Sequence, residues 1–341
     1  MTIIASDPDH DHDTDHDTDT DDPDLPRTRP VYARAELTAR GMTRHDITTA
    51  LEAGSVTRVG RDAYVVGGRA SRERDDLVER GVAVSRRLGE GAVLSHVSAA
   101  ALHGLPLWGL PTGRVTASLP QAGRGHRRTP SLVVYDAPLD GAVTVVDGIP
   151  VTTPARTAVD LARAHRLDPA VCVADRVLAR GLADAEELRR HVDAAAGFRG
   201  VSRARRMLDL ATGDAVNPLE TRSRLAVLRG GLPPAEVNVD LYDESGGFLA
   251  RPDFLWRAWR LVGECDGLGK YTLGGTDKAS VKAAVAEEKA REERLRAAGW
   301  VIIRWMWRDL DDPRALVRRI RAAMLRQEAA GFGPGAGRLS A

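Results

Sequence analysis

The sequence has 341 residues, of which 43% are hydrophobic and 28% charged, so it is an ordinary globular chain that is too long for a single core. No apolar run reaches the roughly 18 residues of a membrane helix, and the acidic N-terminus lacks the pattern of a secretory signal, so we expect a cytoplasmic protein without membrane association. Cys172 and Cys265 are too few and too isolated for a disulfide framework or a structural zinc site.

The formal net charge of +1 hides an asymmetry along the chain. Residues 7–24 hold ten Asp and no Lys or Arg, which leaves 49 basic against 38 acidic residues in the rest. A basic body favours a nucleic-acid partner, because Arg and Lys contact phosphate, although a generally Arg-rich surface is the alternative.

Residues 1–30 are predicted to form a disordered acidic tail, since the run DPDHDHDTDHDTDTDDPD has no apolar residue and repels itself. The segment also contains three histidines among its carboxylates, His10, His12 and His16, a composition that can bind a divalent metal weakly. We instead interpret it as a solvated acidic leader.

Residues 31–70 are predicted to form a winged helix-turn-helix. RAELTARG gives a short helix that Gly41 ends, and Thr43 is placed to cap a second helix that Gly54 ends. SVTRVGRDAYVVG alternates as a β-hairpin does. The alternative is a plain protein–protein module. In a winged helix, the side chains expected to face DNA are Arg44, His45, Arg58 and Arg61.

The stretch LTARGMTRHDITTALEAGSVTRVGRDAYVV resembles the N-terminal domain of AbiEi-type antitoxins of type IV toxin-antitoxin systems. The usual Arg-Gly-Val-Tyr of the wing reads Arg61-Asp62-Ala63-Tyr64 in this chain. The resemblance implies a DNA-binding autoregulator that opposes a nucleotidyltransferase toxin. DNA, such a toxin and a second copy of the chain are therefore the expected partners.

Residues 71–215 are predicted to form an α+β middle region. A helix over about 74–88 precedes the strand-like stretches RVTASLP, SLVVYDA and VTVVDGIPVTT, and Thr153 caps the helix TPARTAVDLARA with Pro154 at its first position. SHVSAAALHGL and IPVTTPARTAVDLA also resemble the middle region of AbiEi-like proteins. His96 and His103 are interpreted as structural, because no nucleophile or acidic residue lies at a spacing from them that would indicate a catalytic site.

Residues 216–330 are predicted to form a small α/β sandwich, with residues 331–341 as a flexible tail. The expected order is a helix, three strands over VNVDLYD, GFLARPDFLWRAW and RLVGECDG, a long helix, a buried strand over WVIIRWMW, and a last helix over DDPRALVRRIRAAMLRQ. The whole chain is thus expected to be a multidomain α/β protein.

A candidate metal site lies in this last domain. A tight connection near Ala258–Trp259 places Asp253 across from Glu264, and Glu264 and Asp266 share a face because side chains alternate along a strand. Converging carboxylates need a cation, and their oxygens suit Mg²⁺ or Mn²⁺. Lys270 is expected to reach the phosphate or the attacking water, and Glu220 to complete the catalytic shell.

Several ordered motifs resemble the PD-(D/E)xK nuclease superfamily, and more narrowly the domains related to the very-short-patch repair endonuclease. The motifs are Pro218-Leu219-Glu220, Arg251-Pro252-Asp253-Phe254, Glu264-Cys265-Asp266-Gly267, Lys270-Tyr271 and EEKAREERLRAAGWVIIRW. The resemblance implies a restriction-endonuclease-like fold. Because acid-x-Lys reads Glu264-Cys265-Asp266 here, the basic role passes to Lys270 or Lys289.

Three functions follow from the sequence. The first is a metal-dependent DNA endonuclease that the N-terminal domain targets. The second is a non-catalytic AbiEi-like antitoxin and transcriptional autoregulator that keeps a degenerate nuclease fold. The third is an RNA-directed enzyme. The sequence feature that favours the first is the combination of Asp253, Glu264 and Asp266, which a pure regulator does not need.

Overall fold

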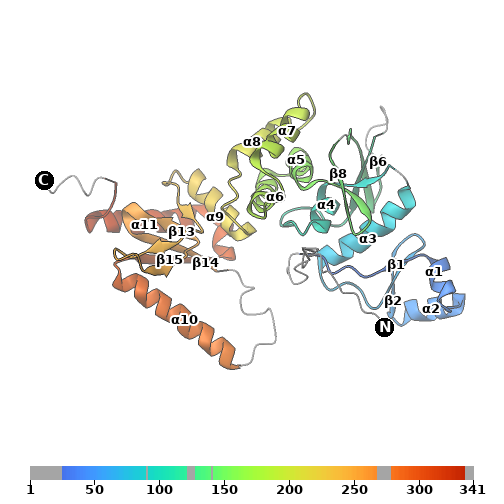
Figure 1. The fold of residues 1–341 in the computed structure, drawn as a ribbon, viewed down its shortest axis with the longest axis horizontal. Coiled ribbons are helices and arrows are strands. Elements are labelled where there is room, and N and C mark those ends of the chain that lie inside the picture. Colours follow the sequence, from blue (N-terminus) through green and yellow to red (C-terminus); the bar gives the residue numbers. More distant parts are fainter. Residues whose placement is uncertain (1–24, 90, 121–126, 140, 267–277, 335–341) are drawn as a thin grey trace, which may run out of the picture.

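The computed structural model describes residues 25–334 except 90, 121–126, 140 and 267–277. The predicted acidic tail lies almost entirely outside these residues, as do Lys270 and most of the predicted C-terminal tail. Among the described residues, no helix combines the length and the apolar character needed to cross a membrane. Helices and several sheets alternate along the chain, which confirms a mixed α/β multidomain protein (Figure 1).

The N-terminal unit consists of two short helices and a three-stranded sheet. Its elements are β1 Val31–Tyr32, α1 Arg34–Ala39, α2 Arg44–Glu52, β2 Val56–Gly60 and β3 Ala63–Val66. The predicted hairpin is present as β2 and β3, and β1, which the sequence did not reveal, pairs with β3 on its other side.

Local sequence determines the start and end of α2. Thr43 Oγ1 accepts a hydrogen bond from the Asp46 amide at 3.2 Å, and the Asp46 carboxylate accepts one from the Thr43 amide at 2.8 Å. This reciprocal pair confirms Thr43 as the cap. Gly54, just past the helix, adopts the left-handed φ of +71° that favours glycine. Ile47 is buried against Leu37 of α1 and Tyr64 of β3.

The middle region combines a mixed sheet with a group of helices. Its strands are β4 Val93–Leu94, β5 Val115–Leu119, β6 Arg127–Arg128, β7 Leu132–Asp136, β8 Val143–Val146 and β9 Ile149–Thr152. Its helices are α3 Glu73–Leu88, α4 His96–Leu102, α5 Pro154–Ala164, α6 Leu167–Ala179, α7 Ala185–Ala194 and α8 Val201–Leu210. The six strands form one sheet in the order β6-β7-β5-β4-β9-β8, and Thr153 caps α5 as predicted.

The C-terminal region is built on a four-stranded sheet in the order β10-β13-β14-β15. The strands of the region are β10 Glu236–Val237, β11 Leu241–Tyr242, β12 Phe248–Ala250, β13 Phe254–Trp256, β14 Leu261–Asp266 and β15 Val301–Met306. The helices are α9 Pro218–Arg229, α10 Lys278–Ala297 and α11 Pro313–Ala329, with short 3-10 turns η1 Arg257–Trp259 and η2 Trp307–Asp311. β14 and β15 run parallel, which requires a crossover between them, and α10 lies in that connection.

Each face of this sheet has its own core. Phe254, Leu261 and Trp305 pack with residues of α9 and α11 on one face. Leu255 and Val262, their neighbours along the strands, pack with Leu295 of α10 on the other face. Helices therefore cover the sheet from both sides, as expected for an α/β sandwich. Trp305 lies so close to Gly263 that an added Cβ there would meet its ring at 2.4 Å, which explains the glycine.

Three predicted strands differ in the structure. The stretch GFLARPDFLWRAW, predicted as one strand, forms β12 and β13, which belong to different sheets. The stretch VNVDLYD divides into β10 and β11, because Asn238 has a left-handed φ of +54° that breaks the extended backbone, and β11 pairs with β12 in a separate ribbon. The strand WVIIRWMW was predicted to be buried, but β15 is an edge strand of its sheet. Only Trp305 is buried in it, and Val301 is 36% exposed.

A buried carboxylate joins the middle region to the C-terminal region. Asp175 of α6 is fully buried, and its oxygens accept hydrogen bonds from Thr221 Oγ1 at 2.8 Å and Arg224 Nη2 at 2.9 Å, both on α9. It also accepts one from the backbone amide of Thr212 at 2.9 Å. The helices α6 and α9 are thus held side by side (Figure 1).

Candidate functional site

The predicted acidic residues come from the start of α9 and from the edge where β13 and β14 meet. Asn217 caps α9 by accepting hydrogen bonds from the Leu219 and Glu220 amides at 2.9 and 3.0 Å, and Pro218 takes the first helical position. This cap fixes Glu220 in the first turn, where its carboxylate is 4% exposed. The element that carries Glu220 was therefore predicted correctly.

Glu220 is bound by three donors. Its carboxylate accepts hydrogen bonds from the Val216 amide at 2.8 Å, from Asn238 Nδ2 at 2.7 Å, and from the side-chain amide of Asn217. Burial nevertheless raises the pKa of Glu220 above its usual value, and the nearby charge of Asp253 raises it further against the effect of these donors. The group thus lies beside a second carboxylate in a poorly solvated position.

Asp253 lies just before β13. The strands β13 and β14 pair with Phe254 opposite Gly263, so the ladder ends one residue short of the predicted pair of Asp253 and Glu264. The Asp253 carboxylate accepts a hydrogen bond from the Cys265 amide at 2.6 Å. One ligand atom from each of Glu220, Asp253 and Cys265 lies within 4.8 Å of the others. Cys265, which is not disulfide bonded, was not singled out from the sequence.

Glu264 lies on the α10 side of the same edge. The residue is 7% exposed, and its carboxylate accepts a hydrogen bond from Arg291 Nη1 at 3.0 Å. Burial raises the pKa of Glu264 to about 7, because the attraction of Arg291 is smaller than the desolvation and Asp253 adds repulsion. Arg291 is shared with Glu288 of α10 at 2.9 Å. We call Glu220, Asp253, Glu264 and Cys265 the acidic cluster.

The donor atoms only partly fit the predicted Mg²⁺. The carboxylates of Asp253 and Glu220 are the hard oxygen ligands that Mg²⁺ or Mn²⁺ prefers, and their mutual repulsion is what a cation would relieve. The Cys265 sulfur is a soft ligand that suits other metals better. Asp266, at the end of β14, is half-buried and is not part of the three-residue group, and Lys270 lies outside the described residues.

The predicted DNA-contacting side chains of the N-terminal unit are all exposed. Arg44 and His45 occupy the first turn of α2, Arg58 lies on β2, and Arg61 lies in the turn between β2 and β3. Arg58 Nε donates to the Gly60 carbonyl at 3.1 Å, within the hairpin. The four side chains thus lie on a helix start and on a hairpin, the two elements with which winged helices contact DNA.

The two histidines of the middle region have structural partners. His103 forms a hydrogen bond through Nε2 to the Thr152 carbonyl at 2.7 Å. His96 is buried, stacks on Tyr135 with 3.7 Å between ring centroids, and interacts through Nδ1 with Ser95 Oγ at 3.0 Å. Burial lowers the pKa of His96 to about 4, so the ring is neutral at physiological pH. Its φ of +49° is strained for a residue other than glycine.

Comparison with known proteins gives relatives over most of the chain. It is 28% identical over 291 residues to "Uncharacterized protein Rv2248" and to "Uncharacterized protein MT2308" of two Mycobacterium tuberculosis strains, which covers 85% of this chain and 100% of each relative. Among solved structures, that of the RV2827C protein from Mycobacterium tuberculosis covers 52% of this chain and 71% of its own, with 21% identity and a TM-score of 0.35, too low to indicate a common overall fold.

The middle region has a family match. The stretches SHVSAAALHGL and IPVTTPARTAVDLA, which were predicted to resemble AbiEi-like proteins, lie within the matched residues. The similarities predicted for residues 31–67 and for residues 217–327 fall outside them and stay predictions. Residues 92–210 of this chain match the family described as the AbiEi antitoxin C-terminal domain.

Proposed function

We propose that this protein is a DNA-binding regulator of the antitoxin type. The observation that carries the proposal is the match of residues 92–210 to the AbiEi antitoxin C-terminal domain. The N-terminal unit supports it, since α2 and the β2–β3 hairpin carry exposed arginines at the positions expected of a winged helix.

In this proposal the start of α2 enters the major groove and the β2–β3 hairpin follows the neighbouring phosphates. Arg44 and His45, in the first turn of α2, contact base edges or phosphate, and Arg58 and Arg61 contact phosphate from the hairpin. The protein then represses its own operon, and a nucleotidyltransferase toxin is its proposed protein partner. The basic surplus outside residues 7–24 adds to DNA affinity through counterion release.

A gel-shift or anisotropy titration with the DNA upstream of the gene tests this proposal. The double variant Arg44→Ala/Arg58→Ala should bind at least about tenfold more weakly and show a smaller dependence on salt, because two cations are removed. Arg205→Ala is the matched control, since Arg205 is an exposed arginine of α8 far along the chain. Equal affinity of the double variant and the control would contradict the winged-helix assignment.

A second candidate function is a metal-dependent phosphodiesterase, which the acidic cluster favours. Glu220 and Glu264 are buried near Asp253, and the pKa of both carboxyl groups is raised, chiefly by burial and further by the charge of Asp253. Carboxylates that repel one another are a common arrangement for holding a divalent cation. A bound Mg²⁺ or Mn²⁺ would supply an activated water and stabilise charge on a scissile phosphate.

In this function Asp253 and Glu220, whose ligand atoms lie close together, would hold the cation, and Glu264 would lie beside them in its ion pair with Arg291. Asp266 and Lys270 remain the predicted acid and base further along the chain. Plasmid DNA incubated with Mg²⁺ or Mn²⁺ should be nicked by the wild-type protein and left intact by Asp253→Asn. Nicking that persists in Asp253→Asn would exclude the acidic cluster as its source.

A further inference from the structure

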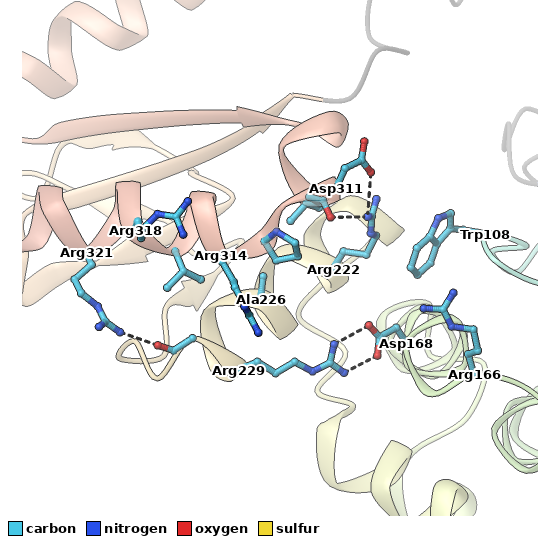
Figure 2. Close-up of a pocket in the computed structure, with 14 residues that line it drawn as sticks. Trp108, Arg166, Asp168, Arg222, Ala226, Arg229, Asp311, Arg314, Arg318 and Arg321 are labelled. Carbon is cyan, nitrogen blue, oxygen red and sulfur yellow. Dashed lines mark hydrogen bonds and ion pairs between the residues drawn. The ribbon is translucent and has the colours of Figure 1, made fainter.

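A large cavity lies between the middle region and the C-terminal region, outside the acidic cluster. Its volume is about 870 Å³, within the usual range for small-molecule sites. Trp108 and the start of α6 form one side, and α9, η2 and α11 form the other (Figure 2). We call it the arginine pocket, after the residues that line it: Arg166, Arg222, Arg229, Arg314, Arg318 and Arg321.

Positive charge dominates this pocket. Against its six guanidinium groups stand two lining carboxylates, Asp168 and Asp311. Asp168 is fully engaged by Arg229, which donates to its two oxygens at 2.7 and 2.5 Å. Asp311 is exposed, and its nearest oxygen lies 4.0 Å from Arg222 Nη2. Like charges at this density repel, so the arrangement favours an anion.

Arg222 is fixed at the inner end of the pocket. Its guanidinium lies 4.6 Å from the ring centroid of Trp108 and 4.3 Å from that of Trp307, and Nη2 donates to the Leu310 carbonyl at 3.1 Å. Its other terminal nitrogen, Nη1, is buried without a hydrogen-bond partner among the described residues. A buried donor without a partner is costly, and a ligand oxygen would satisfy it.

Two other arginines are available to a ligand. Within the described part of the chain, neither Arg166 nor Arg314 forms a hydrogen bond or an ion pair, whereas Arg321 is held by the Gly230 carbonyl at 2.7 Å. Arg166 immediately precedes α6, whose N-terminus no side chain caps, and Arg314 lies in the first turn of α11. The uncapped start of α6 therefore adds partial positive charge to that of the side chains, whereas the start of α11 is capped by the Asp312 carboxylate.

We propose that the arginine pocket binds a nucleotide through its phosphate groups. Planar guanidinium groups bind phosphate oxygens in pairs, and Arg166 and Arg314 are the groups with free donors. The half-buried indole of Trp108 lines the same cavity and offers an aromatic surface to the base (Figure 2). The nucleotide is either free or the phosphorylated end of a single strand.

Calorimetric titration of the full-length protein tests this site. The probes are ATP, GTP, and a short single-stranded oligonucleotide with and without a 5′-phosphate. The variants are Arg166→Gln/Arg314→Gln, Trp108→Leu, and the control Arg326→Gln, an exposed arginine of α11 that does not line the pocket. The double variant should weaken binding at least about tenfold, since it removes two charge-assisted contacts, and the control should bind like the wild type.

The outcomes separate the two sources of the nucleotide. Binding of ATP or GTP that the double variant loses supports a free nucleotide. Binding of the 5′-phosphorylated oligonucleotide alone, lost in the same variant, supports a strand end. In either case Trp108→Leu should weaken binding as well. The proposal is overturned if no probe binds, or if the double variant and Arg326→Gln bind equally. Because no probe is duplex DNA, its failure leaves the winged-helix proposal untouched.

Discussion

The acidic cluster and the arginine pocket both include residues of α9, but they differ in how far repulsion between like charges is compensated by groups of the protein. Glu220 and Arg222 are two residues apart on α9, yet the first belongs to the acidic cluster and the second to the arginine pocket. In the acidic cluster, hydrogen bonds to Glu220 and the ion pair of Glu264 with Arg291 compensate much of the charge. In the arginine pocket, six cations face two carboxylates.

The two clusters also differ in how their remaining charge can be neutralised. Carboxylates can reduce their repulsion by taking up a proton, as the raised pKa of Glu264 indicates. Arginine cannot lose its charge in the accessible pH range, so the arginine pocket can be neutralised only by an anion from outside. Protonation therefore offers the acidic cluster an alternative to a ligand, which the arginine pocket does not have.

The largest predicted effect on the unfolding free energy comes from removing the Asp175 carboxylate, whose hydrogen bonds hold α9 against α6. Asp175→Ala removes a fully buried carboxylate and leaves Arg224 and Thr221 without their partner. The variant should lose about 3–5 kcal/mol of unfolding free energy, the usual cost of breaking a buried pair. Urea unfolding measures it, and Asp209→Ala, at an exposed position of α8, is the control. A loss as small as that of the control would show that this carboxylate does not stabilise the fold.

A smaller effect is expected from pH at Glu264. Its folded pKa of about 7 exceeds the ordinary 4.5, so the native state holds a proton more tightly than the unfolded chain does. The resulting stability is complete below the ordinary value and is lost as the pH rises through 7. Between pH 4.5 and about 7 the unfolding free energy should fall by about 3–4 kcal/mol, at about 1.4 kcal/mol per pH unit.

The isosteric variant Glu264→Gln is the control for this pH dependence. It cannot ionise, so its unfolding free energy should change less between pH values below 4.5 and above 7 than that of the wild type. If the acidic cluster binds Mg²⁺ or Mn²⁺, adding the ion above pH 7 should stabilise the wild type more than Glu264→Gln. Identical pH profiles for the two proteins would show that Glu264 is ionised normally.

The smallest effect concerns Arg222 in the arginine pocket. Arg222→Lys keeps the charge but loses the planar group that lies against Trp108 and Trp307 and donates to Leu310. We expect a loss of about 1 kcal/mol in thermal or urea unfolding, within the range of a cation–π contact. The exposed Arg326→Lys should change nothing. A loss in Arg326→Lys as large as in Arg222→Lys would mean that the stacking contributes no stability.

Sequence patterns predicted the local structure well. Thr43 caps α2 and Gly54 follows its end, as expected, and the connection between β13 and β14 lies at Arg257–Trp259, close to the predicted Ala258–Trp259. Such features depend on a few neighbouring residues, so the sequence contains them directly. Strand β15 was misjudged because whether a strand is central or at an edge depends on its neighbours in the sheet, which its own residues do not specify.

The functional sites were predicted less completely. Glu220 and Asp253 were predicted from sequence motifs. Cys265 was not predicted as a site residue, because the prediction rested on the acidic residues on either side of it, Glu264 and Asp266. The arginine pocket was missed because its residues come from distant segments of the chain. A signal was present, since Arg314, Arg318 and Arg321 recur at intervals of four and three on one face of α11. From the sequence, this segment was predicted only as the last helix, and no inference was drawn from its arginines.

The position of Glu220 and Arg222 on one rigid helix has a thermodynamic consequence. A ligand that displaces α9 as it fills the arginine pocket would also displace Glu220, and so change the affinity of the acidic cluster for a cation. Coupling of this kind is reciprocal, so the cation would change the affinity of the arginine pocket by the same factor. Because Glu220 and Arg222 are only two residues apart on α9, the binding of a phosphate compound and the binding of a metal ion would then be coupled.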